Sequence, residues 1–166
     1  MRAYVLNAPG EGWVQEVPAP VAAPGEVVVD VERVGVCGTD VEFFTGGMAY
    51  LHQGYSSYPM RLGHEWTGTV ASLGSGVDSA WLGRRVMGDT QLGDGTCRRC
   101  RKGDQHVCEN RYELGVRGDR PGALAEQVAV PATSLHALSD VGGTVAGDRP
   151  EAAGPGPIAV MKLMPV

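Results

Sequence analysis

Two short stretches of the chain carry residue types that bind metal ions. Cys37 belongs to a Cys-Gly-Thr-Asp sequence at 37–40, and His64 and Glu65 belong to a Gly-His-Glu-Trp-Thr-Gly sequence at 63–68. A thiolate, an imidazole and a carboxylate together suit zinc better than magnesium or calcium. Three protein ligands leave a fourth position for water or substrate, as in catalytic zinc sites. We therefore predict a catalytic zinc held by Cys37, His64 and Glu65.

A second group of cysteines strengthens the metal hypothesis. Taken singly, a cysteine is usually a small buried hydrophobe. Cys97, Cys100 and Cys108, however, fall within twelve positions, and the Cys-x-x-Cys spacing lets two sulfurs reach one metal from a single turn. In a chain without secretory features, such a group indicates metal ligands before disulfides. It predicts a second, structural zinc, and so two zinc ions per chain.

The elements that must position these ligands read mostly as strands. Residues 26–36 are rich in valine, which favours a buried strand that delivers Cys37 at its end. Residues 62–73 predict a strand whose start presents His64 and Glu65. Residues 44–60 show no clean period and are expected to form a loop over the metal site. Further strands are expected at 2–8, 13–17 and 123–130.

Bulk composition narrows the function classes. The chain has 166 residues, 43% of them hydrophobic, which is enough for one domain with a real core. Its formal net charge of −5 argues against nonspecific binding to nucleic acid or to an anionic membrane. No apolar run approaches the length of a membrane span, and the first residues do not form a signal peptide. A soluble protein of the reducing cytoplasm is expected.

The order of motifs carries a family resemblance. The sequence resembles the zinc-dependent alcohol dehydrogenases of the medium-chain dehydrogenase/reductase superfamily, specifically their GroES-like N-terminal catalytic domain. The resemblance implies a mainly β fold, a partly open barrel with short helices, over 1–140, with a protruding zinc lobe at about 90–112. It rests on the motifs at 37–40, 63–68, 68–74 and 82–86, the cysteine lobe, and Glu-Gln-Val-Ala-Val-Pro at 126–131.

The resemblance also implies roles at the first site. Thr39 would bind the substrate oxygen and pass its proton toward solvent; a threonine here also suits a helix N-cap, and the two roles are compatible. Glu65 would be either a direct zinc ligand or a group that supports one. Some relatives carry a relay histidine where this chain has Glu42. His52 is a candidate to replace it, but we favour the interpretation of His52 as an ordinary exposed loop histidine.

The cysteine lobe departs from the family pattern at one position. Relatives usually carry four cysteines, and the first would fall at Asp94. A carboxylate can bind zinc, so a site of Asp94, Cys97, Cys100 and Cys108 is predicted, with His106 as a fallback ligand. The alternative is a lobe without zinc that merely retains its cysteines.

The nucleotide-binding part of the family pattern is not found in this sequence. No Gly-x-Gly-x-x-Gly follows a strand, and residues 141–166 form a Gly- and Pro-rich tail with no room for a βαβ unit. Gly156 stands where relatives can supply another zinc ligand. NAD(P) is therefore not expected to bind this chain alone, because that domain holds the nicotinamide.

Three functions remain open at this point. The first is an alcohol or polyol dehydrogenase domain acting on a small hydroxyl or carbonyl substrate once a partner or missing segment supplies the cofactor. The second is a non-redox zinc enzyme that uses zinc-bound water for hydration, elimination or isomerisation. The third is a zinc-stabilised binding module without catalysis. Association with a second copy or a partner chain is also expected, because a face that relatives cover would be exposed.

Overall fold

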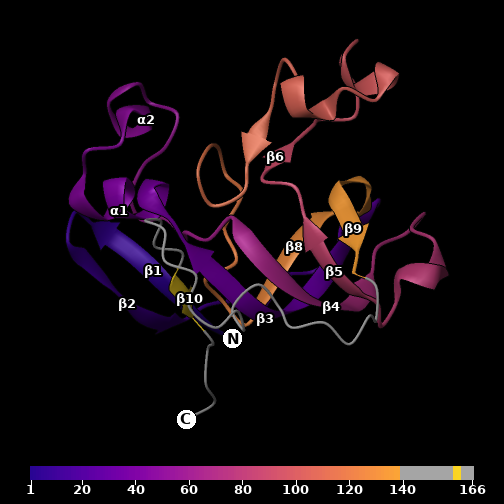
Figure 1. The fold of residues 1–166 in the computed structure, drawn as a ribbon, viewed down its shortest axis with the longest axis horizontal. Coiled ribbons are helices and arrows are strands. Elements are labelled where there is room, and N and C mark those ends of the chain that lie inside the picture. The colour runs from indigo at the N-terminus through magenta and orange to yellow at the C-terminus, as the bar shows by residue number, and fades with distance from the viewer. Residues whose placement is uncertain (139–158, 162–166) are drawn as a thin grey trace, which may run out of the picture.

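Strands make up most of the regular structure in the computed structural model, which describes residues 1–138 and 159–161. Figure 1 shows most of them in one curved sheet, with two helices at one side. The strands are β1 (Arg2–Ala8), β2 (Glu11–Glu16), β3 (Glu26–Val36), β4 (Glu65–Leu73), β5 (Arg85–Gly88), β6 (Gln91–Leu92), β7 (Tyr112–Glu113), β8 (Gln127–Pro131), β9 (Leu135–Ala137) and β10 (Ala159–Met161). The α-helices are α1 (Gly38–Thr45) and α2 (Ala49–His52), and short 3₁₀ helices lie at Ser79–Trp81, Cys100–Lys102, Gln105–Val107 and Ala132–Ser134.

The central strand of the sheet is β3. It pairs antiparallel with β4 over nearly its whole length, from Val27 opposite Leu73 to Gly35 opposite Glu65. It also pairs with β8 through its first half and with β10 through its last three residues. β5 and β9 extend the sheet beyond β4. The strands β4, β8 and β10 are therefore paired directly with β3, and β5 is joined to it through β4.

The valines of β3 explain its central place. β-branched side chains suit the pleated surface of a sheet, and Val27, Val28 and Val29 are all buried. Val27 and Val29 belong to the same core as residues of β4 and β8. The largest fully buried side chains of that core are Leu6, Phe43, Val70, Val86, Leu92, Leu114, Val128 and Val130.

The hairpin of β1 and β2 closes against the rest of the molecule through isolated bridges. Ala3 bridges to Ala125, and Leu6 exchanges backbone hydrogen bonds of 2.8 and 2.9 Å with Met60. Arg2 adds an ion pair at 2.8 Å to Glu126. The backbone N–H of Arg2 and this guanidinium together lower the pKa of the Glu126 carboxyl. These contacts tie the N-terminal hairpin to the chain just before β8.

Helix α1 begins directly after β3. Its N-cap is Cys37, and the Asp40 carboxylate accepts a 2.9 Å hydrogen bond from the Cys37 backbone N–H. A carboxylate in the first turn also interacts favourably with the helix dipole. The helix ends at Gly46, which has φ 80°, a conformation that glycine adopts without strain. The helix therefore starts at the residue that the sequence singled out as a ligand.

The cysteine lobe projects from the sheet (Figure 1). It leaves after β6 and returns at β7, and these two strands pair only with each other, at Gln91 opposite Glu113 and Leu92 opposite Tyr112. Two 3₁₀ helices supply most of its regular structure. The lobe is therefore joined to the sheet through a narrow two-stranded base.

The expected fold class is confirmed: mainly β, GroES-like, with short helices and a cysteine-rich lobe. The strands at 2–8 and 26–36 have the predicted bounds, whereas those expected from 62 and 123 begin later, at Glu65 and Gln127.

No parallel βαβ unit is present among the described residues. No helix in that part of the chain is long and apolar enough to cross a membrane. The tail at 141–166 lies outside the described residues except for β10.

Gly68 tests the close packing of β3 against β4. A Cβ at this position would lie 2.2 Å from the backbone oxygen of Asp30, which cannot move without breaking the sheet. We expect Gly68→Ala to lower the free energy of unfolding by about 1–3 kcal/mol. Gly47→Ala is the control, because its Cβ would meet only Thr45 Oγ1 at 3.7 Å. Urea unfolding of the metal-loaded chain measures both, and equal stability of the two variants would contradict the packing described.

Candidate metal centres

Cys37 and His64 meet at the end of the β3–β4 ladder. Their donor atoms, Cys37 Sγ and His64 Nε2, lie 3.1 Å apart. His64 is buried and immediately precedes β4, while Cys37 immediately follows β3. The Thr90 hydroxyl donates a 3.1 Å hydrogen bond to the His64 carbonyl and fixes its backbone. Two candidate ligands that are 27 residues apart in sequence are thus placed side by side by strand pairing.

Asp40 completes this group from helix α1. Its Oδ1 lies 3.7 Å from His64 Nδ1, and neither of these buried atoms has a hydrogen-bond partner among the described residues. Its Oδ2 is engaged with the Cys37 backbone. Because Nε2 faces the thiol and Nδ1 faces Asp40, the carboxylate is placed to orient the imidazole from behind. One potential donor atom from each of Cys37, Asp40 and His64 lies within 4.8 Å of the others.

These residues fit a zinc ion. Sulfur and nitrogen ligands of a tetrahedral zinc, at about 2.3 and 2.0 Å from the metal, lie roughly 3.5 Å from each other. The observed 3.1 Å separation needs only a small opening to reach that value. His64 Nδ1 is buried, has no hydrogen-bond partner among the described residues and faces the Asp40 carboxylate. Metal-binding histidines commonly have a carboxylate in this position.

The other predicted residues of the first site lie nearby in sequence but are not gathered in this group. Glu65 is half-buried at the start of β4, opposite Gly35, and it is not among the donors within 4.8 Å of one another. Thr39 is half-buried in the first turn of α1, between Cys37 and Asp40. Both assignments stay predictions.

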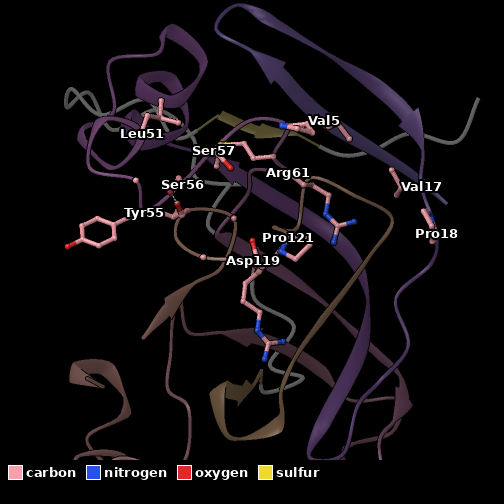
Figure 2. A pocket seen from close by; sticks show the side chains of 17 residues that line it. Val5, Val17, Pro18, Leu51, Tyr55, Ser56, Ser57, Arg61, Asp119 and Pro121 are labelled. Atoms are coloured by element: carbon pink, nitrogen blue, oxygen red, sulfur yellow. Dashed lines mark hydrogen bonds between the residues drawn. The ribbon is translucent and has the colours of Figure 1, made fainter. Parts of the chain in front are cut away.

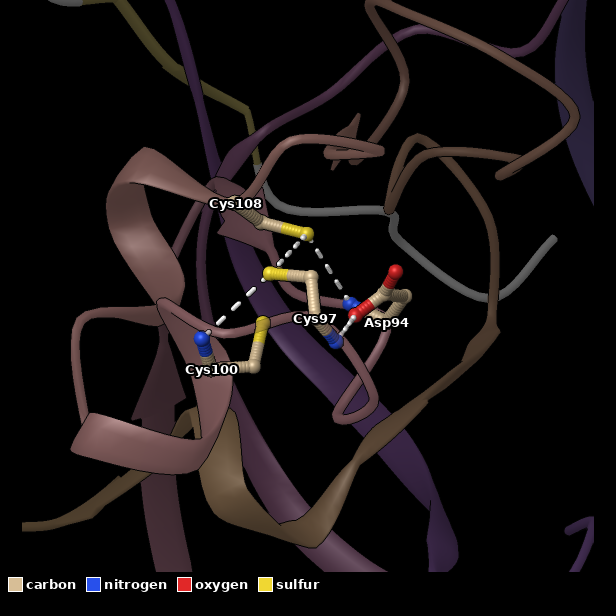
Figure 3. Close-up of side chains that lie close together, drawn as sticks. All are labelled: Asp94, Cys97, Cys100 and Cys108. Carbon is tan, nitrogen blue, oxygen red and sulfur yellow. Dashed lines mark hydrogen bonds between the residues drawn. The ribbon is translucent and has the colours of Figure 1, made fainter.

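The second group of ligands lies in the lobe. Figure 3 shows Asp94, Cys97, Cys100 and Cys108 pointing toward one another, and their donor atoms all lie within 4.8 Å of one another. The sulfurs of Cys97 and Cys108 are 3.8 Å apart. That distance equals the edge of a tetrahedral zinc–thiolate site, roughly 3.8 Å for zinc–sulfur bonds of about 2.3 Å. Backbone N–H groups of Asp94 and Asn110 point at the Cys108 sulfur at 3.4 and 3.3 Å.

The Asp94 carboxylate also accepts hydrogen bonds within the lobe. Its Oδ1 accepts hydrogen bonds from the backbone N–H groups of Thr96 and Cys97, at 2.8 and 3.0 Å. Its Oδ2 accepts one from the Asn110 side chain at 2.9 Å. The bond from Cys97 is the first cause that holds the pKa of Asp94 well below its usual range. The group is therefore an anion, which is the form that could bind a cation while still shaping the loop.

The lobe thiols differ in acidity. A hydrogen bond from the Cys100 backbone N–H is the largest cause that lowers the pKa of Cys97 to about 7. Burial is the largest cause that raises the pKa of Cys100 to about 12. Because zinc binds thiolates, Cys97 offers a ready ligand at neutral pH, whereas Cys100 must release a proton when a metal binds.

Two contributors to the first site were not recognised from sequence. Asp40 has no role among the ligands predicted from sequence, although its spacing of three from Cys37 places it beside any ligand at the helix start. Thr90 had no sequence signal, because it reaches the His64 carbonyl through the fold alone. His52 and His106 are exposed, and neither belongs to a group of potential ligands among the described residues.

Comparison with known families decides the identity of the domain. Residues 23–140 match the model of the alcohol dehydrogenase GroES-like domain. The chain belongs to this family. The match spans β3, the first metal centre, the cysteine lobe and β8, so both groups of candidate ligands lie inside the family domain. Two candidate metal sites of this kind are typical of zinc-containing alcohol dehydrogenases.

Individual relatives agree with the family match. An L-threonine 3-dehydrogenase of Legionella pneumophila (strain Corby) is 38% identical over 128 residues, which cover 77% of this chain and 36% of the relative. Galactitol-1-phosphate dehydrogenase of Escherichia coli has a similar structure, with a TM-score of 0.72 and 31% identity over 85% of this chain and 39% of that one. A cobalt- and zinc-bound alcohol dehydrogenase of Pyrobaculum aerophilum gives a TM-score of 0.70 and 30% identity, over 82% and 40%. The GroES-like chain thus spans about two-fifths of these relatives.

The acidity of the lobe thiols can be tested in the metal-free chain. Alkylation by iodoacetamide requires the thiolate, so we expect Cys97 to react with a midpoint near pH 7 and to be modified before Cys100 at pH 8. Peptide mass spectrometry after timed labelling measures both sites. Cys97→Ser serves as the control and should leave no reaction with that midpoint. Earlier labelling of Cys100 would show that the assigned hydrogen bonds do not set the acidity.

Proposed function

We propose that this chain is the zinc-binding catalytic domain of an alcohol or polyol dehydrogenase, acting on a small hydroxyl or carbonyl substrate. The observation that carries the proposal is the 3.1 Å approach of Cys37 Sγ to His64 Nε2, backed by a buried Asp40. A purely structural site has no need of an open position, whereas this group offers fewer side-chain donors than the four that a closed zinc site uses.

We assign the catalytic domain to residues 1–140, with the lobe at about 90–112 and the tail at 141–166. The family match over 23–140 supports the C-terminal boundary. The first 22 residues are included because β1 bridges to Met60 and Ala125, which lie on either side of the lobe in sequence. The lobe bounds follow β6 and β7, which form its base.

Each residue of the first site has a role in this proposal. A zinc ion held by Cys37 and His64 would supply a Lewis acid beside the substrate oxygen. Asp40 Oδ1 lies 3.7 Å from His64 Nδ1 and would accept its proton in a hydrogen bond when the site closes around a metal, which keeps Nε2 free to act as a ligand. Thr39, two residues beyond Cys37, receives the proton of the substrate hydroxyl and passes it toward solvent. Glu65 is proposed as a further carboxylate donor or as a proton acceptor next to His64.

The substrate class follows from this chemistry and from the relatives. Oxidation breaks the C–H bond of a carbinol with its electron pair leaving as hydride, while the hydroxyl proton departs through Thr39. The relatives named above are dehydrogenases of threonine, a sugar-alcohol phosphate and alcohols. The hydride acceptor is NAD or NADP, held by a partner or by a segment other than residues 1–138, whose described strands form no dinucleotide-binding unit.

Metal analysis tests the two centres separately. Elemental analysis of metal-replete chain should give about two zinc ions, with Cys37→Ala and Cys97→Ala each removing one. His64→Ala should remove the same ion as Cys37→Ala. His136→Ala is its matched control, because His136 pairs with Asp89 at 2.8 Å outside both groups and should leave both ions bound. A replete protein without zinc would contradict the proposal.

Two further variants distinguish the contributions of Asp40 and Glu65 to zinc binding at the first centre. We expect Asp40→Asn to weaken zinc retention at this site by about 10- to 100-fold, the usual effect of removing the partner of a metal-bound histidine. Glu65→Gln should do the same only if Glu65 is a direct ligand. Competition with a chelator gives both affinities, and an unchanged affinity in Asp40→Asn would remove Asp40 from the site.

Dinucleotide binding is expected to be absent from the isolated chain. Among the described residues there is no glycine-rich turn that leads from a parallel strand into a helix, so the pyrophosphate would find no helix N-terminus to receive it. Calorimetric titration with NAD and NADP should give no heat of specific binding. Tight binding of either would show that the chain carries its own cofactor site, contrary to the division of labour proposed.

A further inference from the structure

A cavity in the described part of the chain lies apart from both metal centres. It opens between the end of β2, the segment 54–61 and the turn 115–121, and has a volume of about 880 Å³ (Figure 2). No residue of either ligand group lines it. Sites for small organic ligands commonly have volumes of about 300–1,000 Å³. The cavity is therefore large enough for a small molecule and is not used by the proposed reaction.

Arg61 extends into this cavity without a counter-charge. Its side chain is half-buried, and its Nε is shielded from solvent with no hydrogen-bond partner among the described residues. Burial lowers the pKa of Arg61 to about 10, so the guanidinium is still charged at neutral pH. A buried N–H without a partner destabilises the fold, and a charged one does so more strongly. A guanidinium in this state provides a strong site for an acceptor supplied from outside.

The other charged groups in the walls are already committed or exposed. Arg120 forms a 2.5 Å ion pair with Glu26 and lies over the Tyr112 ring. Asp119 is exposed, and no ion pair between Asp119 and Arg61 forms in the described part of the chain. Arg61 is thus the cation of this cavity that has a free hydrogen-bonding face.

The rest of the wall is suited to an apolar body. Val5, Val17, Met60 and Pro121 line the cavity, and Figure 2 places Val5, Val17 and Pro121 around the open space into which Arg61 points. Ser56 donates its hydroxyl to the Val116 carbonyl and so holds the segment 54–61 against the turn 115–121. The cavity therefore combines the unpaired guanidinium of Arg61 with apolar walls on two sides.

We infer that this cavity binds a small organic anion, whose carboxylate or phosphate group pairs with Arg61 and whose apolar body lies against Val17 and Met60. An oxyanion offers two acceptors to the planar fork of a guanidinium, which fits arginine better than any single acceptor. Asp119 opposes this ligand by like-charge repulsion, and its removal should strengthen binding. The inference is independent of the proposed dehydrogenase activity, because it uses none of the metal-centre residues.

Nuclear magnetic resonance of the zinc-loaded, ¹⁵N-labelled chain tests the inference at the atom concerned. The Arg61 Nε–H signal, assigned through its loss in Arg61→Lys, should shift and saturate on titration with phenyl phosphate or with benzoate. The tighter of these two identifies the anionic group. Inorganic phosphate should bind at least about 10-fold more weakly, since it lacks an apolar body. An equal response to chloride at matched ionic strength, or no response to any anion, would overturn the site.

Variants separate the site from general surface charge. Arg61→Gln should weaken binding of the better probe by about 10- to 100-fold, and Asp119→Asn should strengthen it. Arg84→Gln is the matched control, because Arg84 is exposed and does not line the cavity. This variant should bind the better probe with the affinity of the wild-type chain. Arg61→Lys is the second variant, for use if Arg61→Gln does not fold. It keeps the charge but loses the planar guanidinium, so it should bind the probe with an affinity between those of the wild type and Arg61→Gln. Equal loss in the Arg61 and Arg84 variants would refute the inference.

Discussion

The pairing of β3 with β4 is the interaction on which the first metal centre depends. In an antiparallel pair the end of one strand adjoins the start of the other, so Gly35 opposite Glu65 places Cys37 and His64 at the same edge. A shift of one residue in this register would turn every side chain of one strand to the opposite face. The register is held by buried valines on β3 and by Gly68, whose missing side chain lets β3 approach. The metal ligands are therefore positioned by the core.

Each candidate centre has an aspartate three residues from a cysteine, with Asp40 after its cysteine and Asp94 before it. Asp40 accepts from the backbone N–H of Cys37 at 2.9 Å, and Asp94 accepts from that of Cys97 at 3.0 Å. In each case the hydrogen bond fixes the turn that carries the thiol, and the second carboxylate oxygen faces another group, His64 in one centre and Asn110 in the other. At position 94 the hydrogen bonds from Thr96, Cys97 and Asn110 let aspartate support the local turn.

The sequence predicted those features that depend on local pattern. A run of valines was sufficient for the bounds of β3, and cysteine spacing was sufficient to predict that Cys97, Cys100 and Cys108 lie close together. Features that depend on long-range contacts could not be predicted in this way. β4 begins three residues later than expected because Leu62 and Gly63 form hydrogen bonds with Leu124 and Ala123. The environment of Arg61 also depends on segments that lie far apart in the chain.

The segment 61–64 joins the inferred anion cavity to the first metal centre through rigid backbone. Arg61, Leu62 and Gly63 accept hydrogen bonds from the N–H groups of 122, 124 and 123, at 2.8, 3.0 and 2.7 Å. Gly63 has φ 97°, and a Cβ there would meet the Leu124 backbone nitrogen at 2.6 Å, so no other residue fits this approach. Three consecutive backbone hydrogen bonds therefore hold the short segment that runs from Arg61 to His64. The cavity and the first candidate centre lie at the two ends of this segment, although they share no side chain.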